Sequence, residues 1–241
     1  MADARPTALL LDLDDTILSD SSGAALYWER VCALHASDIA PHTPAELVDA
    51  INAYRAWYWS DPERHRVGRM DLAAARTHIV TEALHSLGMT GAHAAALAHD
   101  IGQRYAELRE AGLEPLPGAL EAVDTLRERG QRLALLTNGA ALAQRRKIER
   151  YDLARHFELI LIEGEFGCGK PDPRVYQHAL RTLELAPERV WMVGDNLEWD
   201  VLAPQRLGIA GVWINPAGRP LPDGVTGRPF RVISALADLT R

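Results

Sequence analysis

The second half of the chain alternates between short apolar runs and longer stretches with helical periodicity. Strands are predicted from the apolar runs at 132–137, 157–162, 190–194 and 211–214. Helices are predicted before and between them, at 118–129, 141–151, 173–184 and about 198–207. Because parallel strands must be joined by crossover connections, this alternation indicates a parallel sheet with helices on both faces. Pro204 lies inside the last helix and predicts that it is short or kinked.

One further strand is predicted near the start of the chain. Residues 7–13 form a nearly continuous apolar run, typical of a strand buried on both faces, with Asp12 near its carboxyl end. No strand pattern follows between Leu18 and Gly112, where helices are predicted at 23–36, 43–59, 71–88 and 91–111. The capping box Thr43-Pro44-Ala45-Glu46 marks the start of the second of these helices.

These patterns predict an α/β core that is interrupted after its first strand by an all-helical unit of four or five helices. The core is assigned to residues 1–18 and 113–241, and the inserted unit to 19–112. A short strand and a final helix are expected within 230–239.

Charge and apolar pattern exclude several classes of function. The net charge of −7 gives no broad electrostatic reason to bind nucleic acid or an anionic membrane. No stretch approaches the roughly 18 apolar residues of a membrane span, and the apolar run near the start is too short for a signal peptide. We therefore expect a cytoplasmic protein, either a monomer or a homodimer. Cys32 and Cys168 match no metal-ligand spacing and are expected to be free thiols.

Polar side chains cluster in the sequence at or shortly after the ends of four predicted strands. In chain order they are Asp12, Asp14, Asp15, Thr16, Thr137, Asn138, Lys170, Asp195, Asn196 and Asp200. Because ligands of open α/β sheets bind outside the carboxyl ends of the strands, these residues are expected to line one site. Carboxylates, a hydroxyl and an ammonium group together suit phosphoryl transfer, which needs a nucleophile, a cation and hydrogen-bond donors.

The carboxylates offer a nucleophile, an acid and a metal site. Asp12 and Asp195 are the expected direct ligands of Mg²⁺, which prefers hard oxygen donors. Asp12 can hold the ion with one oxygen and attack phosphorus with the other. Asp14 can protonate the leaving alcohol and then activate water, provided that neighbouring carboxylates raise its pKa.

The remaining polar groups are expected to bind the phosphate. The hydroxyl of Thr137 and the backbone N–H of Asn138 can donate hydrogen bonds to its oxygens. Lys170, between Gly169 and Pro171, supplies positive charge to a site that is otherwise crowded with carboxylates.

Four motifs in this sequence resemble, in order, those of the haloacid dehalogenase superfamily. They are Asp-Leu-Asp-Asp-Thr (12–16), Thr-Asn-Gly (137–139), Gly-Lys-Pro-Asp-Pro (169–173) and Gly-Asp-Asn-Leu-Glu-Trp-Asp (194–200). The match covers the entire core, and the four motifs together are far more specific than a single Asp-x-Asp.

The resemblance implies a Rossmann-like core with a mobile helical cap of the C1 type, as in subfamily I phosphatases. It also implies Asp12 as the nucleophile, Asp14 as the general acid and base, and Mg²⁺ held by Asp12, the Asp14 carbonyl and Asp195. Asp200 is then a further ligand or a residue that supports the ligands, although it could also stabilise a helix start. The stretch 194–215 is most similar to phosphatases of sugar phosphates and nucleotides, including N-acylneuraminate-9-phosphatase.

Other functions remain open within the same family. A 2-haloacid dehalogenase also uses an aspartyl ester but generally lacks an acidic residue at the position of Asp14. A phosphomutase returns the phosphoryl group to its substrate, and the sequence does not exclude it. A silent binding module is disfavoured by the complete set of polar residues. The leading interpretation is a Mg²⁺-dependent phosphatase of a small phosphorylated metabolite.

Several residues have two interpretations. The aromatic and basic cluster at 55–66 could grip a substrate, but packing inside the helical unit is favoured. Trp28 is ambiguous in the same way. Asp15 is expected to bind backbone at a turn rather than to take part in chemistry, and Cys168 is expected to be inert.

Overall fold

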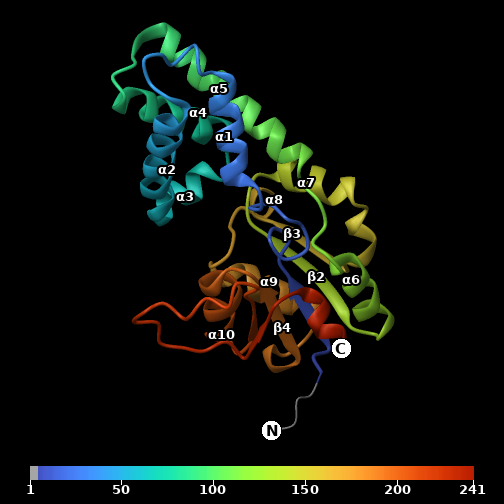
Figure 1. Cartoon of the computed structure of the whole chain (residues 1–241). Helices are drawn as coiled ribbons and strands as arrows, with labels where there is room; N and C mark the ends of the chain where they lie inside the picture. Colours follow the sequence, from blue (N-terminus) through green and yellow to red (C-terminus); the bar gives the residue numbers. More distant parts are fainter. Residues whose placement is uncertain (1–4) are drawn as a thin grey trace. The chain divides into compact units, whose positions relative to one another are not determined.

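A six-stranded parallel sheet lies at the centre of the first of two units, within the described residues 5–241 of this computed structural model (Figure 1). The strands are β1 Ala8–Leu11, β2 Arg132–Thr137, β3 Leu159–Ile162, β4 Val190–Gly194, β5 Ala210–Ile214 and β6 Arg231–Ile233. Their order is β3-β2-β1-β4-β5-β6. The predicted α/β fold class is therefore confirmed; residues 1–4 of the predicted core segment 1–18 lie outside the described residues.

Strand β1 lies at the centre of the sheet, where Leu10 stands opposite Ala134 on β2 and Met192 on β4. All four residues of β1 are buried. On one face, α9 (Pro173–Leu183) packs its Tyr176 into the same buried cluster as Leu10. An apolar strand of this kind needs cover on both faces, which explains its lack of polar alternation.

Helices and short helical segments connect the strands, and Figure 1 shows α6 and α9 on opposite sides of the sheet. The remaining α-helices of this unit are α6 Ala119–Glu128, α7 Ala141–Arg150, α8 Glu163–Phe166 and α10 Ala203–Gln205. The short 3₁₀ or π-helical segments are η1 Leu153–His156, η2 Pro187–Arg189, η3 Leu197–Leu202 and η4 Leu236–Thr240. The predicted order of strands and helices is thus confirmed, including the final strand and helical turn.

Two connections differ from the sequence prediction. The connection after β3 contains α8, which was not predicted because it is too short to produce a periodic pattern in the sequence. The helix expected at about 198–207 is instead the π-helical segment η3, followed by the single turn α10. Pro204 lies in that turn and has no backbone N–H to donate, so the predicted interruption is confirmed.

The second unit, Ser21–Leu113, consists of five helices around its own buried cluster. They are α1 Ala24–Leu34, α2 Pro44–Ser60, α3 Pro62–Gly68, α4 Leu72–Ser86 and α5 Gly91–Ala111. The predicted capping box is present, because Thr43 and Glu46 each accept a hydrogen bond from the other's backbone N–H. Trp28 is buried and stacks on Tyr105 with ring centroids 3.7 Å apart, so it belongs to the core of this unit.

The aromatic and basic cluster at 55–66 spans the end of α2 and the start of α3. Tyr58 and Trp59 pack against the buried cluster of the unit, in agreement with the favoured interpretation. That interpretation is wrong for Trp57, which is 51% exposed. The guanidinium of Arg64 lies 3.9 Å from the Trp57 ring centroid and covers part of it.

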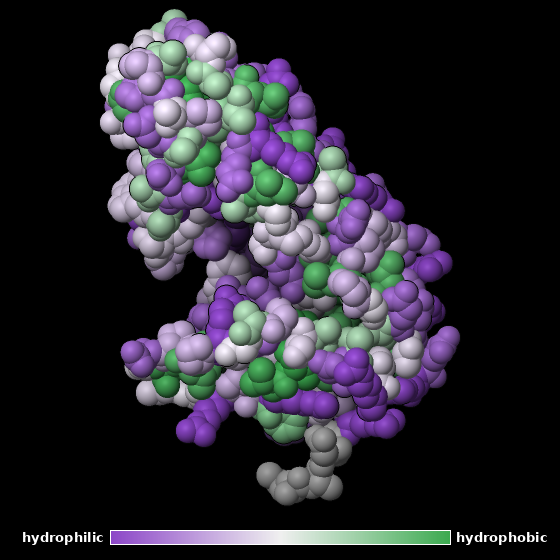
Figure 2. All heavy atoms as spheres, in the orientation of Figure 1, coloured by the Kyte–Doolittle hydropathy of each residue, from purple (hydrophilic) through white to green (hydrophobic). Residues whose placement is uncertain are grey.

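Backbone contacts divide the chain into Met1–Asp20 with Glu114–Arg241, and Ser21–Leu113. The sequence-based boundaries lie at 18/19 and 112/113; the roles of catalytic core and cap stay predictions. In the part of the chain that the structure describes, no helix is long and apolar enough to cross a membrane. In Figure 2, hydrophilic and hydrophobic residues are interspersed over the visible surface of each unit.

The two threonine caps of the second unit give a matched test of this fold. Thr43 accepts a hydrogen bond from a backbone N–H of α2, whereas the side chain of Thr90 makes no such bond at the start of α5. We expect Thr43→Ala to lower the free energy of unfolding by about 1 kcal/mol, measured by urea denaturation. Thr90→Ala should change it by only a few tenths of that amount, and equal losses would contradict the assignment of the cap.

Candidate active site

From β1 the chain adds β2 and β3 on one side of the sheet, and β4, β5 and β6 then follow on the other side. The sheet therefore has a switch point between β1 and β4. Ligands of open α/β sheets bind at such a switch point, outside the carboxyl ends of the strands. Asp12 directly follows β1, and Asp195 directly follows β4. The backbone N–H of Asp12 donates to the Val193 carbonyl at 3.0 Å, which fixes the start of this loop against β4.

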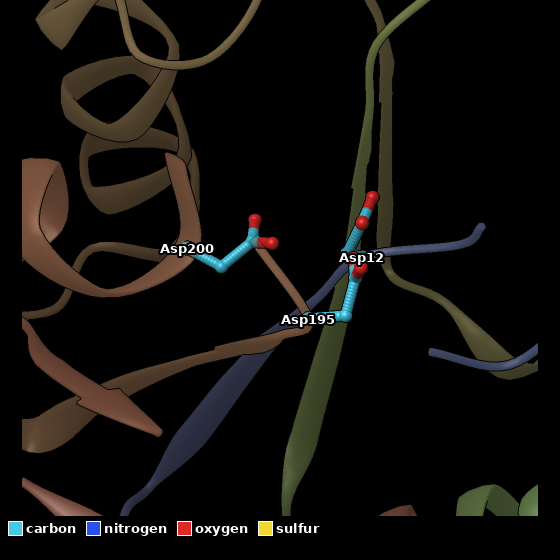
Figure 3. Close-up of side chains that lie close together, drawn as sticks. All are labelled: Asp12, Asp195 and Asp200. Atoms are coloured by element: carbon cyan, nitrogen blue, oxygen red, sulfur yellow. The ribbon is translucent and has the colours of Figure 1, made fainter. Parts of the chain in front are cut away.

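Three carboxylates meet at this point: those of Asp12, Asp195 and Asp200. One oxygen from each lies within 4.8 Å of the other two. Figure 3 shows Asp12 and Asp195 side by side, with Asp200 directed toward them from η3. Gly194 makes this approach possible, because a Cβ atom at that position would overlap the Asp200 carboxylate.

Lys170 provides positive charge to the three carboxylates. Its Nζ lies 2.8 Å from Asp12 Oδ1 and 2.7 Å from Asp200 Oδ1, and the residue is only 1% exposed. Asn138 holds the backbone of Lys170 on both sides. The Asn138 Nδ2 donates to the Lys170 carbonyl at 2.6 Å, while its Oδ1 accepts from the Lys170 N–H at 2.8 Å.

Asp14 lies in a second set of contacts, which the sequence did not predict. Lys147 Nζ on α7 is 2.7 Å from Asp14 Oδ1 and 3.0 Å from Asp20 Oδ1. Gln144 Nε2, also on α7, donates to Asp14 Oδ2 at 2.8 Å and to Thr137 Oγ1 at 2.5 Å.

Through these contacts and the carboxylate cluster, the structure brings together the seven residues to which the sequence assigned a role in catalysis, phosphate binding or metal binding. They are Asp12, Asp14, Thr137, Asn138, Lys170, Asp195 and Asp200. Asp15 has a separate role, because its carboxylate accepts the Asp20 N–H at 3.0 Å at the turn, as the sequence predicted.

A further buried carboxylate also lies at this edge of the sheet. Glu163 in α8 accepts the Gly139 N–H at 2.9 Å, and so holds the backbone after β2. No role was predicted for Glu163 from the sequence.

One signal in the sequence could have identified Lys147. Of the 26 basic residues of the chain, only Lys147 and Lys170 are lysines, and all the others are arginines. Both lysines lie between two carboxylates, as Lys147 contacts Asp14 and Asp20 and Lys170 contacts Asp12 and Asp200. An ammonium group is a compact point charge, which suits a position between two carboxylates better than the planar guanidinium does.

The sequence model of the haloacid dehalogenase-like hydrolases matches residues 6–208, which include every residue of the site. This chain belongs to that family. The resemblance inferred from the four motifs is confirmed.

Curated relatives of this hydrolase include enzymes named as phosphatases. Phosphoserine phosphatase of Thermus thermophilus is 37% identical over 88% of this chain and 90% of its own length. N-acylneuraminate-9-phosphatase of Mus musculus is 38% identical, but the match spans 45% of this chain and 44% of the mouse enzyme.

Solved structures of the family share the fold of this hydrolase. The HAD-hydrolase YfnB from Bacillus subtilis, solved bound to magnesium, has a TM-score of 0.73 at 22% identity and covers 98% of this chain and 97% of its own. A 2-haloacid dehalogenase from Pseudomonas syringae has a TM-score of 0.62 at 23% identity and covers 97% and 96%. At such identities the likeness concerns the fold alone.

Burial and repulsion between neighbouring carboxylates shift the pKa values of the acidic groups in the site of this hydrolase. Burial raises the pKa of Asp12 well above its ordinary value; Lys170 opposes this shift, and Asp200 and Asp195 add to it. Burial likewise raises the pKa of Asp195 to about 7, and the nearby charges of Asp200 and Asp15 contribute. Burial alone would lower the pKa of Lys170, but the carboxylates of Asp12 and Asp200 outweigh it, so that pKa is raised.

The pKa of Asp14 is also raised, and the main cause differs from the one predicted. Burial is the largest contribution, and the neighbouring Asp20 carboxylate adds a smaller one. Lys147 and Gln144 act in the opposite direction by favouring the ionised form. Asp14 is thus able to carry a proton at a higher pH than an ordinary aspartate.

The shift at Asp195 predicts a pH-dependent effect on stability. With the folded pKa at about 7, above the unfolded value of about 3.9, the folded state binds this proton more tightly. Its ionisation therefore destabilises the metal-free fold as pH rises from about 4 to about 7. Asp195→Asn should stabilise chelator-treated protein by about 1 to 3 kcal/mol at about pH 8, and by much less near pH 4.5.

The measurement is thermal unfolding in EDTA at the two pH values. Asp223→Asn, which removes an exposed carboxylate, is the matched control and should leave the midpoint nearly unchanged. A gain for Asp195→Asn that does not grow with pH would contradict the assigned shift.

Proposed function

We propose that this hydrolase is a Mg²⁺-dependent phosphoric monoester hydrolase that forms a phospho-aspartyl intermediate on Asp12. The observation that carries the proposal is the cluster of Asp12, Asp195 and Asp200 around Lys170, with Asp14 held close to the same edge of the sheet. The phosphatase name of the relative that aligns over most of both chains supports the same conclusion.

The chemistry of the donor set fits Mg²⁺. Three carboxylates and one ammonium group leave an excess of two negative charges when all are ionised, which a divalent cation would neutralise. We assign Asp12, Asp195 and the Asp14 carbonyl as the groups that would hold the ion. When bound, Mg²⁺ supplies positive charge that offsets the repulsion between a phosphate and the attacking carboxylate.

Asp200 is proposed to support the site through its contact with Lys170. Its Oδ1 accepts from Lys170 Nζ at 2.7 Å, and its Oδ2 accepts from the Asn196 N–H at 3.0 Å. The residue is fully buried, and each of its oxygens accepts one of these hydrogen bonds. Its role is to fix the ammonium group of Lys170 beside Asp12.

Phosphoryl transfer then follows from the placed groups. Asp12 attacks phosphorus, the ester P–O bond breaks, and Asp14 gives its proton to the departing alkoxide. A water molecule next attacks the aspartyl phosphate, and Asp14 takes the proton of that water as the phosphate leaves. Lys170 stays beside Asp12 throughout and stabilises the negative charge of the transferring group.

Thr137 and Asn138 are proposed to bind the phosphate oxygens. Gln144 donates to Thr137 Oγ1, which leaves the hydroxyl hydrogen of Thr137 available for a phosphate. The side chain of Asn138 is engaged with Lys170, so its backbone N–H is the group proposed to contact the phosphate.

The substrate is proposed to be a small phosphorylated metabolite. The relatives named above act on phosphoserine and an N-acylneuraminate 9-phosphate, both of which are small phosphate esters. The helical segment 19–112, which the sequence assigns as a cap, would close over such a substrate and exclude water. A net charge of −7 gives no reason to favour a nucleic acid.

Asp14 is the feature that separates this proposal from a dehalogenase. Displacement of a halide from carbon needs no protonation of the leaving group, whereas expulsion of an alkoxide from phosphorus does. The contacts of Asp14 with Lys147 and Gln144 support this assignment, because they fix one orientation of its carboxyl group. A phosphomutase would use the same residues and differs only in the acceptor of the second step.

Substitutions of the two aspartates test the mechanism. Asp12→Asn should abolish turnover, by about a thousandfold or more, because no carboxylate remains to attack phosphorus. Asp14→Asn should slow both steps by about a hundredfold or more and allow the phosphorylated enzyme to accumulate. The measurements are phosphate release and intact-protein mass, with circular dichroism to control for folding. Normal turnover by Asp12→Asn would remove the central claim.

A substrate panel with and without metal separates the alternatives. We expect Mg²⁺-dependent phosphate release from at least one of phosphoserine, sugar phosphates, nucleoside monophosphates and phosphoglycolate, with loss of activity after EDTA and recovery on adding Mg²⁺. Chloride release from a 2-haloacid without metal, together with no phosphate release, would favour the dehalogenase. Formation of an isomeric hexose phosphate would favour the mutase.

A further inference from the structure

Lys147 on α7 makes contacts with two carboxylates beside the proposed acid. Its Nζ lies 2.7 Å from Asp14 Oδ1 and 3.0 Å from Asp20 Oδ1. The lysine side chain is 17% exposed, and that of Asp14 is 27% exposed. Both groups are therefore shielded enough for the ion pair to be stronger than one on the open surface.

Gln144 completes the set of contacts around Asp14. It lies one helical turn before Lys147 on α7, so the two side chains leave the same face of the helix. Lys147 holds Oδ1 of Asp14, and Gln144 holds Oδ2 at 2.8 Å. A carboxylate offers about four lone-pair sites, so each oxygen keeps one site for a proton or a leaving group.

We propose that Lys147 is a positioning residue that fixes the Asp14 carboxyl group in the orientation needed for proton transfer to the leaving alcohol. This inference rests on the proposed phosphatase function. Without Lys147, Oδ1 of Asp14 loses its charged partner, and the side chain is free to turn away from the reacting ester. A misplacement of about 1 Å can lower a rate about a hundredfold, so such a loss of orientation is measurable.

The use of lysine at this position supports a specific role. The chain has only two lysines among its 26 basic residues, and the other, Lys170, is the buried partner of the proposed nucleophile. A surface cation without a positional task could equally be an arginine, as the adjacent and exposed Arg146 is. An ammonium group suits Lys147 because it bridges two carboxylates from a single point.

Lys147 also contacts Asp20, which lies where the chain leaves the first unit. Asp20 is the last residue of the first unit before the chain continues into Ser21–Leu113. Lys147 therefore ties the proposed acid to the point at which the chain leaves the sheet-containing unit. The orientation of Asp14 is set by α7 and by this exit point together.

The test compares two esters that need protonation of the leaving group to different extents. An alkyl phosphate expels a strongly basic alkoxide, while p-nitrophenyl phosphate expels a stable anion that needs almost no proton. Lys147→Met should lower kcat/KM for the alkyl phosphate by about tenfold to a hundredfold, and for p-nitrophenyl phosphate by less than about threefold. Arg146→Met removes the neighbouring exposed cation and should change neither value.

Equal losses for the two esters would indicate a purely structural role for Lys147, and no loss for either would indicate no role. Either result would overturn the inference.

A double-mutant cycle tests whether Lys147 acts through Asp14. In the Asp14→Asn background, Lys147→Met should change kcat/KM for the alkyl phosphate by less than about twofold, because the group that it positions is already lost. Full additivity of the two losses would also overturn it.

These results are distinguishable from a failure of the proposed function. The alkyl phosphate is the panel compound that the wild-type enzyme hydrolyses fastest. Wild-type enzyme that releases phosphate from no panel compound and not from p-nitrophenyl phosphate in the presence of Mg²⁺ would sink the phosphatase proposal, and this inference with it. Wild-type enzyme that hydrolyses both esters, with a Lys147→Met variant that keeps the wild-type preference between them, would sink the inference alone. Thermal unfolding of each variant shows whether a loss of activity reflects a loss of fold.

Discussion

Repulsion among three shielded carboxylates is the constraint that organises this protein. Asp12, Asp195 and Asp200 approach within 4.8 Å, and burial of such charges is costly unless positive charge is supplied nearby. Lys170 supplies part of it, with ammonium contacts of 2.8 and 2.7 Å to Asp12 and Asp200. Burial is the main cause of the raised pKa values of Asp12 and Asp195; the neighbouring carboxylates add to both shifts, and Lys170 offsets only part of them. The excess negative charge of the three carboxylates over Lys170 suits the cluster to a divalent cation.

The fold supplies this cluster by bringing together loops that are far apart in the sequence. The reversal of strand order places the ends of β1 and β4 side by side, so Asp12 and Asp195 meet although 182 residues lie between them. Gly194 admits the Asp200 carboxylate where any side chain would block it. Asn138, at the end of β2, holds the backbone of Lys170 from both sides. Together these contacts hold the three carboxylates and Lys170 at one edge of the sheet.

The sheet and the site residues at the strand ends could be predicted because both leave signals within short stretches of the sequence. Long amphipathic helices, apolar strands and the Thr43 capping box are visible within short windows. The acidic motifs stand directly at strand ends, where topology alone brings them together. Lys147 and Gln144 could not be placed in the same way, because they lie inside a helix and their partner Asp14 is more than a hundred residues away. The short helix α8 was missed because it is not long enough to repeat a pattern. A helix was predicted where η3 lies, but its π-helical form leaves no distinct periodicity in so short a segment.

The scarcity of lysine has a chemical consequence of its own. Apart from the α-amino group, this chain carries primary amines only at Lys147 and Lys170, and both bridge pairs of carboxylates in the site. Reagents and metabolites that acylate or glycate amines would therefore find no side-chain target on the rest of the surface. Lys170 is almost completely buried, which leaves Lys147 as the more accessible side-chain amine. Any acylation of a lysine in this chain would therefore neutralise the positive charge beside Asp12 or Asp14.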